Sequence, residues 1–282
     1  MPLLSVLWGF ALLSLIAISL LATSGTSRNV ARNALEATRM GAVAEAALVR
    51  TAMGLSDSRP DRRWIADRRP EHFEFDGLPA VITVQDELGR IDLNYADRGL
   101  LFGLLRAGGM DAGSANQLID AILDHRAPDA PQSATVADVS SGLRAEQSVR
   151  RHGLFQSVDE LRLVPGMTSD VFGRIVPALT VYSQHQAFDP ELAPPEALLA
   201  LPGMTPDHVA ELLSARAARQ QSSANVDAML PPLKGRAFTI RIRIGGQRAA
   251  RTYEAAIRFT GDPDQPYWLL DWHDQRTLVA PQ

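Results

Sequence analysis

The sequence contains no cysteine, which excludes disulfide bonds, thiolate metal sites and a cysteine nucleophile. It also lacks an excess of basic residues: 28 Lys and Arg stand against 32 Asp and Glu, giving a formal net charge of -4. A general nucleic-acid-binding protein needs surplus positive charge to neutralise phosphates, so this balance disfavours that class. A hydrophobic fraction of 46% with 21% charged residues is typical of globular chains and excludes a disordered one.

Common catalytic motifs are missing as well. The sequence has no H-E-x-x-H, no G-x-S-x-G and no phosphate-binding Gly-Lys loop, and its six histidines are scattered without the spacing of metal ligands. Asp124 and His125 are adjacent, so a helix would point them in different directions. A membrane-anchored hydrolase would need a catalytic cluster, and we therefore expect a protein that is not an enzyme.

Charged side chains are also missing before Arg28. Residues 3–22 read LLSVLWGFALLSLIAISLLA, about twenty residues that span roughly 30 Å as a helix and match a bilayer core. The alternative, a cleaved secretory signal, needs a basic start, a shorter apolar centre and a clear cleavage site. We predict a retained membrane helix in contact with lipid, marked by Leu3, Leu4, Ser5, Trp8, Leu12, Leu15 and Ala22.

The helical pattern continues beyond the apolar run. Residues 28–55 contain no proline, and small residues such as Ala34, Ala37, Gly41 and Ala44 recur on one face. We predict one continuous helix over residues 1–55 that leaves the membrane and allows another helix to pack closely. If Met1 is the true start, the arginines that follow the apolar run would place the bulk of the chain in the cytoplasm.

The rest of the chain changes pattern twice. Residues 56–95 alternate apolar and polar side chains as in strands, with an expected turn between two strands at 87–90. Residues 96–218 read as short helices, and residues 219–282 return to alternation at 237–246, 251–259 and 267–272. Strands on both sides of a helical block predict one β domain with a helical insertion.

An imperfect repeat occurs three times in the helical block, at 104–123, 161–179 and 198–215. Each copy has an apolar helix end, a Gly-Met turn, a polar cap and a second helix. The turn glycines are Gly109, Gly166 and Gly203, and the expected caps are Asp111, Thr168 and Thr205. Glycine accepts the left-handed conformation that closes a helix, and the polar residues accept hydrogen bonds at the next helix start, so we predict helical hairpins.

These hairpins resemble the helix-hairpin-helix motif, whose turn can hold DNA phosphates through backbone amides. A phosphate-binding turn normally carries a second glycine. Here Met-Thr or Met-Asp follows the first, and Asp111, Asp170 and Asp207 would repel phosphate. A membrane-anchored helix-hairpin-helix DNA-binding protein is thus the alternative hypothesis, and structural hairpins without nucleic acid are the favoured one.

One cluster of carboxylates is a candidate metal site. Asp120 and Asp124 are four residues apart on a predicted helix, and Asp129 follows. Clustered oxygens near a loop suit calcium, although the EF-hand spacing is absent and such aspartates are usually only solvated.

Three segments carry a family resemblance: LLSVLWGFALLSLIA near the start, DELGRIDLNYA at 86–96 and FQSVDELRLVPGMTSDVFGRIVPALTVYS at 155–183. In this order they resemble the K-type minor pseudopilins of type II secretion systems, the general secretion pathway protein K family. The resemblance implies an α+β, pilin-like fold: a long N-terminal helix packed on an antiparallel sheet, with a large all-helical insertion domain.

The resemblance also implies a function and partners. Family members sit at the tip of a periplasmic pseudopilus with the I- and J-type minor pseudopilins, prime its assembly with other secretion components, and support export of folded proteins across the outer membrane. It implies a single-pass inner-membrane protein with its bulk in the periplasm, and N-terminal methylation. Calcium is the cofactor it implies, with Asp124 and Asp129 as candidate ligands.

The chain departs from the family pattern in two respects. No basic leader precedes Met1, so prepilin peptidase becomes a partner only if a leader lies upstream; such a leader would place the N-terminus in the cytoplasm. The loop RAPDAPQSATVADVSSG is poorer in acidic residues than the calcium-associated loop of the family. If Met1 is the first residue of the mature chain, Ser5 stands where other pilins carry a glutamate that pairs with a neighbouring subunit; the resemblance implies that K-type members lack it, which suits a subunit with none above it.

Overall fold

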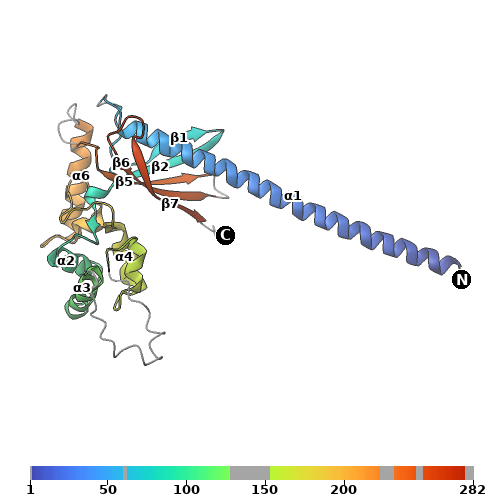
Figure 1. Ribbon diagram of the computed structural model, residues 1–282, viewed down its shortest axis with the longest axis horizontal. Helices are drawn as coiled ribbons and strands as arrows, with labels where there is room; N and C mark the ends of the chain where they lie inside the picture. The colour runs from blue at the N-terminus through green and yellow to red at the C-terminus, as the bar shows by residue number, and fades with distance from the viewer. Residues whose placement is uncertain (1, 60–61, 128–152, 223–231, 246–249, 277–282) are drawn as a thin grey trace, which may run out of the picture.

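The computed structural model describes residues 2–59, 62–127, 153–222, 232–245 and 250–276. It is an α+β structure in which one very long helix packs on an antiparallel sheet and shorter helices gather beside that sheet (Figure 1). The α+β class expected from the sequence is confirmed. The N-terminus and the short helices lie at opposite ends of the molecule (Figure 1).

Helix α1 runs from Pro2 to Leu55 without a break, as expected from the absence of proline inside it. Its first half projects away from the rest of the chain, and its last turns cross the sheet (Figure 1). Val43, Ala44 and Ala47 are fully buried there. Because these side chains are small, the helix backbone approaches the strands closely, and the contact forms one hydrophobic core.

The main sheet has five antiparallel strands in the order β1-β2-β5-β6-β7. Their bounds are Glu71–Phe75, Leu78–Asp86, Ala237–Ile244, Arg251–Phe259 and Tyr267–Arg276. On β5, Ile240 and Ile242 are buried against α1 whereas Arg241 and Arg243 are exposed, which is the alternation of a sheet with one covered face. The three C-terminal strands expected from the sequence are therefore confirmed.

The expected turn at 87–90 does lie between two strands, β2 and the short strand Ile91–Asp92, but the second of them belongs to another sheet. The hairpin turn lies earlier, at Asp76 and Gly77, which both have positive φ angles and join β1 to β2. Asp-Gly is a common sequence for such two-residue hairpins, so this dipeptide was a sequence signal from which the turn could have been predicted. Residues 87–89 instead form a short 3-10 helix, η1 (Glu87–Gly89), through which the chain leaves the sheet.

The segment between β2 and β5 builds a second core from short elements. They are β3 (Ile91–Asp92), α2 (Arg98–Ala107), α3 (Ala112–Arg126), η3 (Val158–Leu163), α4 (Ser169–Ile175), η4 (Val176–Ala178), β4 (Leu179–Thr180), α5 (Pro195–Leu198) and α6 (Pro206–Ser222). Strands β3 and β4 pair in parallel as a small separate sheet. The buried residues of this region, such as Leu118 and Phe172, form a cluster distinct from the one beneath α1.

Close packing in the second core restricts one glycine strongly. A Cβ atom at Gly103 of α2 would overlap the carbonyl oxygen of Ala200, which is backbone and cannot turn aside. We expect Gly103→Ala to lower the free energy of unfolding by about 1–3 kcal/mol, the usual cost of overpacking.

The matched control is Gly173→Ala in α4, because nothing lies within 4 Å of the added Cβ there. This change should be neutral or raise the free energy of unfolding by up to about 1 kcal/mol, since alanine is the better helix former. Urea unfolding of both variants decides the matter; equal effects at the two glycines would contradict the close approach.

Candidate functional site

A polar junction forms where the chain passes from the sheet to the short helices. Asp86, the last residue of β2, makes a buried ion pair with Arg236, which directly precedes β5. The Asp86 carboxylate also accepts a hydrogen bond from the backbone N–H of Leu88 at 2.9 Å and so caps η1. Burial raises the pKa of Asp86 to about 6, although the charge of Arg236 opposes the shift. The junction therefore ties both ends of the helical segment to the sheet.

The residues that follow Asp86 continue this connection. Glu87 is almost completely buried and pairs with Arg90 at 3.3 Å. Gly89 lies against the carbonyl of Leu192, where any side chain would overlap the backbone. The amide of Asp189 donates to the carbonyl of Leu88 at 2.7 Å, so this tight contact brings the loop before α5 onto η1.

Asp92 and Asn94 hold the second half of the same segment. The buried Asp92 carboxylate accepts hydrogen bonds from Ser183 Oγ at 3.1 Å and from the Gln184 amide at 2.7 Å. Asn94 makes two hydrogen bonds with the backbone of Phe155, at 3.0 and 2.7 Å. The motif DELGRIDLN thus makes structural contacts: through Asn94 and Asp92 it holds both ends of the stretch 155–183 in place.

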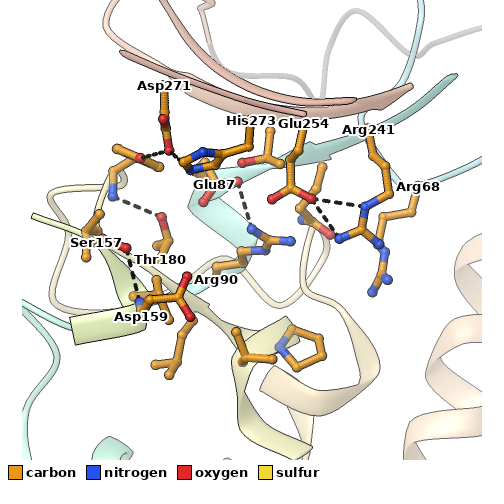
Figure 2. Close-up of a pocket in the computed structure, with 18 of the residues that line it drawn as sticks. Arg68, Glu87, Arg90, Ser157, Asp159, Thr180, Arg241, Glu254, Asp271 and His273 are labelled. Atoms are coloured by element: carbon orange, nitrogen blue, oxygen red, sulfur yellow. Dashed lines mark hydrogen bonds and ion pairs between the residues drawn. The ribbon is translucent and has the colours of Figure 1, made fainter. Parts of the chain in front are cut away.

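A pocket of about 250 Å³ opens between the sheet and these loops (Figure 2). Several of its charged side chains pair across the pocket: Arg241 with Glu254 at 2.8 Å, and His273 with Asp271 at 2.6 Å. Arg68 and Asp159 also line it, and they pair with Glu196 and Arg162 outside the lining. Asp271 also accepts a hydrogen bond from the Tyr182 hydroxyl, and burial together with this carboxylate raises the pKa of that hydroxyl.

The serine in this pocket, Ser157, caps a short helix. The Ser157 hydroxyl oxygen accepts a hydrogen bond from the Asp159 amide, as an N-cap of η3 (Figure 2). Catalysis by serine would need a base at hydrogen-bonding distance that takes the hydroxyl proton. Among the residues described here, the pocket presents balanced ion pairs and caps, which is the chemistry of a packing interface.

The helical-hairpin turns are where the sequence placed them. Gly109, Gly166 and Gly203 all have positive φ angles, from 75° to 97°. Asp111 accepts hydrogen bonds from the amides of Gly113 and Ser114, Thr168 from that of Val171, and Thr205 from that of His208. The hydrogen bonds from Ser114 and Gly113 lower the pKa of Asp111. Since side chains of the chain itself occupy the amides at these three helix starts, the hairpins act as structural turns.

Only one of the two calcium candidates lies among the described residues. Asp124 lies exposed in the last turn of α3, whereas Asp129 falls outside the described residues. Asp120, one turn earlier, forms an ion pair with Arg98 of α2. In the part of the chain that is described, no three His, Asp or Glu side chains are grouped as a metal site. Calcium binding thus stays a prediction.

The side of α1 that faces away from the sheet exposes a row of apolar side chains. Leu35, Val49 and Met53 are exposed on it, and Met53 has 64% of its surface accessible. Ala42 is exposed between them, so small and apolar residues follow one another along this face. Isolated exposed apolar residues are normal, but a row at helical spacing indicates a helix-packing face. We call Leu35, Ala42, Val49 and Met53 the outer face of α1.

The predicted membrane residues are only partly described. Trp8 and Leu12 are exposed on α1, while the side chains of Leu3, Leu4, Ser5, Leu15 and Ala22 lie outside the described set. Among the described residues, no helix has an apolar stretch long enough to cross a membrane.

The junction generates a test of stability. Asp86→Ala would leave the buried charge of Arg236 without its carboxylate, so we expect the free energy of unfolding to fall by about 3–5 kcal/mol. The double variant Asp86→Leu with Arg236→Met removes both charges and should lie closer to the parent than Asp86→Ala does.

Asp57→Ala is the matched control, because the Asp57–Arg59 ion pair is more exposed and solvent screens such pairs, so its loss should change the free energy of unfolding little. Chemical denaturation of the three variants measures these differences. An Asp86→Ala variant as stable as Asp57→Ala would show that the buried pair does not hold the junction.

Comparison with known proteins agrees with this architecture. Residues 88–184 match the family model "Type II secretion system (T2SS), protein K". A chain from the crystal structure of the GspK-GspI-GspJ complex of the enterotoxigenic Escherichia coli type 2 secretion system shares the fold, with a TM-score of 0.57, 15% identity, and coverage of 87% of this chain and 99% of that one. No curated protein sequence is significantly similar. The segment that contains most of the junction is thus similar to protein K of type II secretion systems, and the chain as a whole shares its fold with a chain of the GspK-GspI-GspJ complex.

Proposed function

We propose that this protein occupies the tip of a type II secretion pseudopilus, primes its assembly together with I- and J-type minor pseudopilins, and so supports export of folded proteins across the outer membrane. The observation that carries the proposal is the two-sided use of α1. One face of the helix is buried against the sheet, and the outer face is exposed and apolar. A helix of this kind holds its own domain and offers a second surface to neighbouring helices.

The spacing of the outer face supports packing against another helix. Leu35, Ala42 and Val49 recur every seven residues, and Met53 follows four residues after Val49. Residues at such intervals lie on one side of a helix and form the seam of helix pairs. Ala42 allows two backbones to approach closely, as close helix–helix packing requires.

The position of the short helices supports a tip location. They form an insertion between β2 and β5 and gather at the end of the molecule farthest from the N-terminus (Figure 1). If the first turns of α1 sit in the inner membrane, as the apolar run at 3–22 predicts, this bulk lies on the periplasmic side, away from the bilayer. A subunit added above would have to displace it, so the insertion caps the filament.

The partners are proposed from chemistry and from likeness together. The structural relative assembles, by its description, as GspK with GspI and GspJ. An exposed apolar helix face is the feature through which this chain would join the corresponding I- and J-type subunits. We propose a structural role, because the polar side chains described around the pocket beside the junction act in ion pairs and helix caps, as Arg241 does with Glu254 and Ser157 with Asp159.

The outer face of α1 can be tested directly. The full chain is co-expressed with the I- and J-type minor pseudopilins of the same cell, extracted in detergent and purified through an affinity tag on one partner. The double variant Val49→Glu with Met53→Glu should reduce recovery of the three-protein complex by about tenfold or more, because two buried carboxylates would oppose helix packing.

Leu163→Glu is the matched control, since Leu163 is also an exposed apolar residue but lies on η3 among the short helices. Circular dichroism and thermal unfolding must show that both variants fold like the parent. Full recovery of the complex with the α1 double variant would refute this face as the docking surface. Absence of any complex with the unaltered chain would refute the tip role itself.

A further inference from the structure

The outer edge of strand β7 combines two features that soluble sheets normally avoid. β7 closes one side of the sheet, so its outer edge has no neighbouring strand among the described residues. Trp268, Leu269 and Leu270 follow one another on it and are 53%, 51% and 38% exposed. Unpaired edges template the addition of another strand, and proteins usually protect them with charges or cover. Here three consecutive apolar residues are uncovered.

The two faces of this edge are both apolar. Trp268 stands opposite Arg258 in the register with β6, and Arg258 donates to the Tyr182 carbonyl and to Gln184, on the side of the short helices. Leu269 stands opposite Ile257, which belongs to the core beneath α1. Opposite residues of neighbouring strands share a face, so Trp268 and Leu269 flank the edge from its two sides.

This geometry favours a strand over a helix as the occupant. A helix would cover one face of the sheet and leave the other apolar side chain in water. A strand added beside β7 would place alternate side chains on both faces, against Trp268 on one and Leu269 on the other. Its backbone would also pair with the open edge of β7. The register shift between Ala256 and Ile257 leaves Leu270 without a partner on β6, which adds to the uncovered surface.

The charges near this edge select the occupant. Asp262 and Asp264 are exposed in the turn that leads into β7, and Asp271 and Asp274 lie on the strand itself. His273 pairs with Asp271, Arg251 pairs with Asp274, and Arg276 is a further basic residue of β7, so the charges along the strand itself nearly balance. The acidic side chains that face a partner are Asp262 and Asp264 of the turn, with Lys234 beside Gly261. An extended segment with basic residues that meet this turn would be attracted, whereas an acidic segment would be repelled.

We propose that β7 is a docking strand that receives, by strand addition, an extended partner segment in which apolar residues alternate with basic ones. This binding surface is separate from the outer face of α1 and does not depend on the proposed tip role. Its contacts are the backbone edge of β7, the side chains of Trp268 and Leu269 on the two faces, and the aspartates of the adjoining turn.

The test uses the full chain in detergent and a synthetic strand peptide of about eight residues that alternates valine with lysine. Fluorescence anisotropy of the labelled peptide measures binding, with protein-free micelles as the blank. Hydrogen exchange then locates the site, and we expect slower exchange in β7 only when the peptide is present. A peptide that alternates valine with glutamate should bind roughly tenfold more weakly.

Two variants separate the apolar and the charge contributions. Leu269→Lys places a like charge beside the lysine peptide and should weaken binding by roughly tenfold or more. Asp264→Lys leaves the strand intact and should reverse the preference between the two peptides. The Val49→Glu, Met53→Glu variant of α1 should bind the lysine peptide like the parent, which distinguishes this surface from the filament contact.

Three results would overturn the proposal: no protection of β7 by the lysine peptide, equal binding of the two peptides, or unchanged binding by Leu269→Lys. Analytical ultracentrifugation of the chain alone tests the remaining possible occupant of the β7 edge, a second copy of the same chain. A dimer that Leu269→Lys dissociates would show that β7 pairs with a second copy, and this would also overturn the assignment of a basic partner.

Discussion

The pairing of β2 with β5 is the constraint on which the rest of the structure depends. These strands form the centre of the sheet, yet the buried ion pair beside them joins residues 150 positions apart, Asp86 and Arg236. The chain segment between them must therefore leave the sheet and return to it at the same point. Long loops alone would make such a closure entropically costly. The second core reduces that cost because it folds the intervening chain into a packed unit of its own.

The polar contacts of the junction follow from this closure. A purely apolar junction could slide, since hydrophobic contacts have no direction. Asp92 and Asn94 instead make hydrogen bonds of fixed geometry to residues around 155 and 183, and Gly89 permits a backbone contact that no other residue allows. The matched family region, 88–184, covers these contacts. The motif therefore fixes how the short helices are oriented on the sheet. The pocket beside it is lined by further ion pairs, such as Arg241 with Glu254.

Much of the fold could be predicted from local patterns. The continuous α1, the alternating strands β5 to β7 and the three capped glycine turns each depend on neighbours in sequence, so periodicity and turn chemistry reveal them. The hairpin at Asp76–Gly77 was available from its Asp-Gly dipeptide, but the expectation placed a turn at 87–90 because Gly89 also reads as a turn residue. The actual reason for that glycine is the carbonyl of Leu192, about which a local pattern carries no information.

Long-range partners explain why the rest could not be predicted. Nothing near Asp86 in sequence indicates Arg236, and a buried carboxylate looks the same in sequence as a solvated one. The exposed faces had a similar ambiguity. Alternation identified the strand at 267–272, but whether β7 lies inside the sheet or at its edge depends on strand order, which only the fold supplies.

The two exposed apolar surfaces have different physical consequences. The outer face of α1 is convex and helical, so it suits packing against other helices, where small residues allow close approach. The β7 edge adds directional backbone hydrogen bonding, so it can distinguish partners by strand register and by charge. One chain can thus take part in a helical assembly through α1 while its sheet edge stays open at the side. Helix α1 packs mainly on β2 and β5, whereas β7 forms the far edge of the sheet, so the two surfaces lie on different elements.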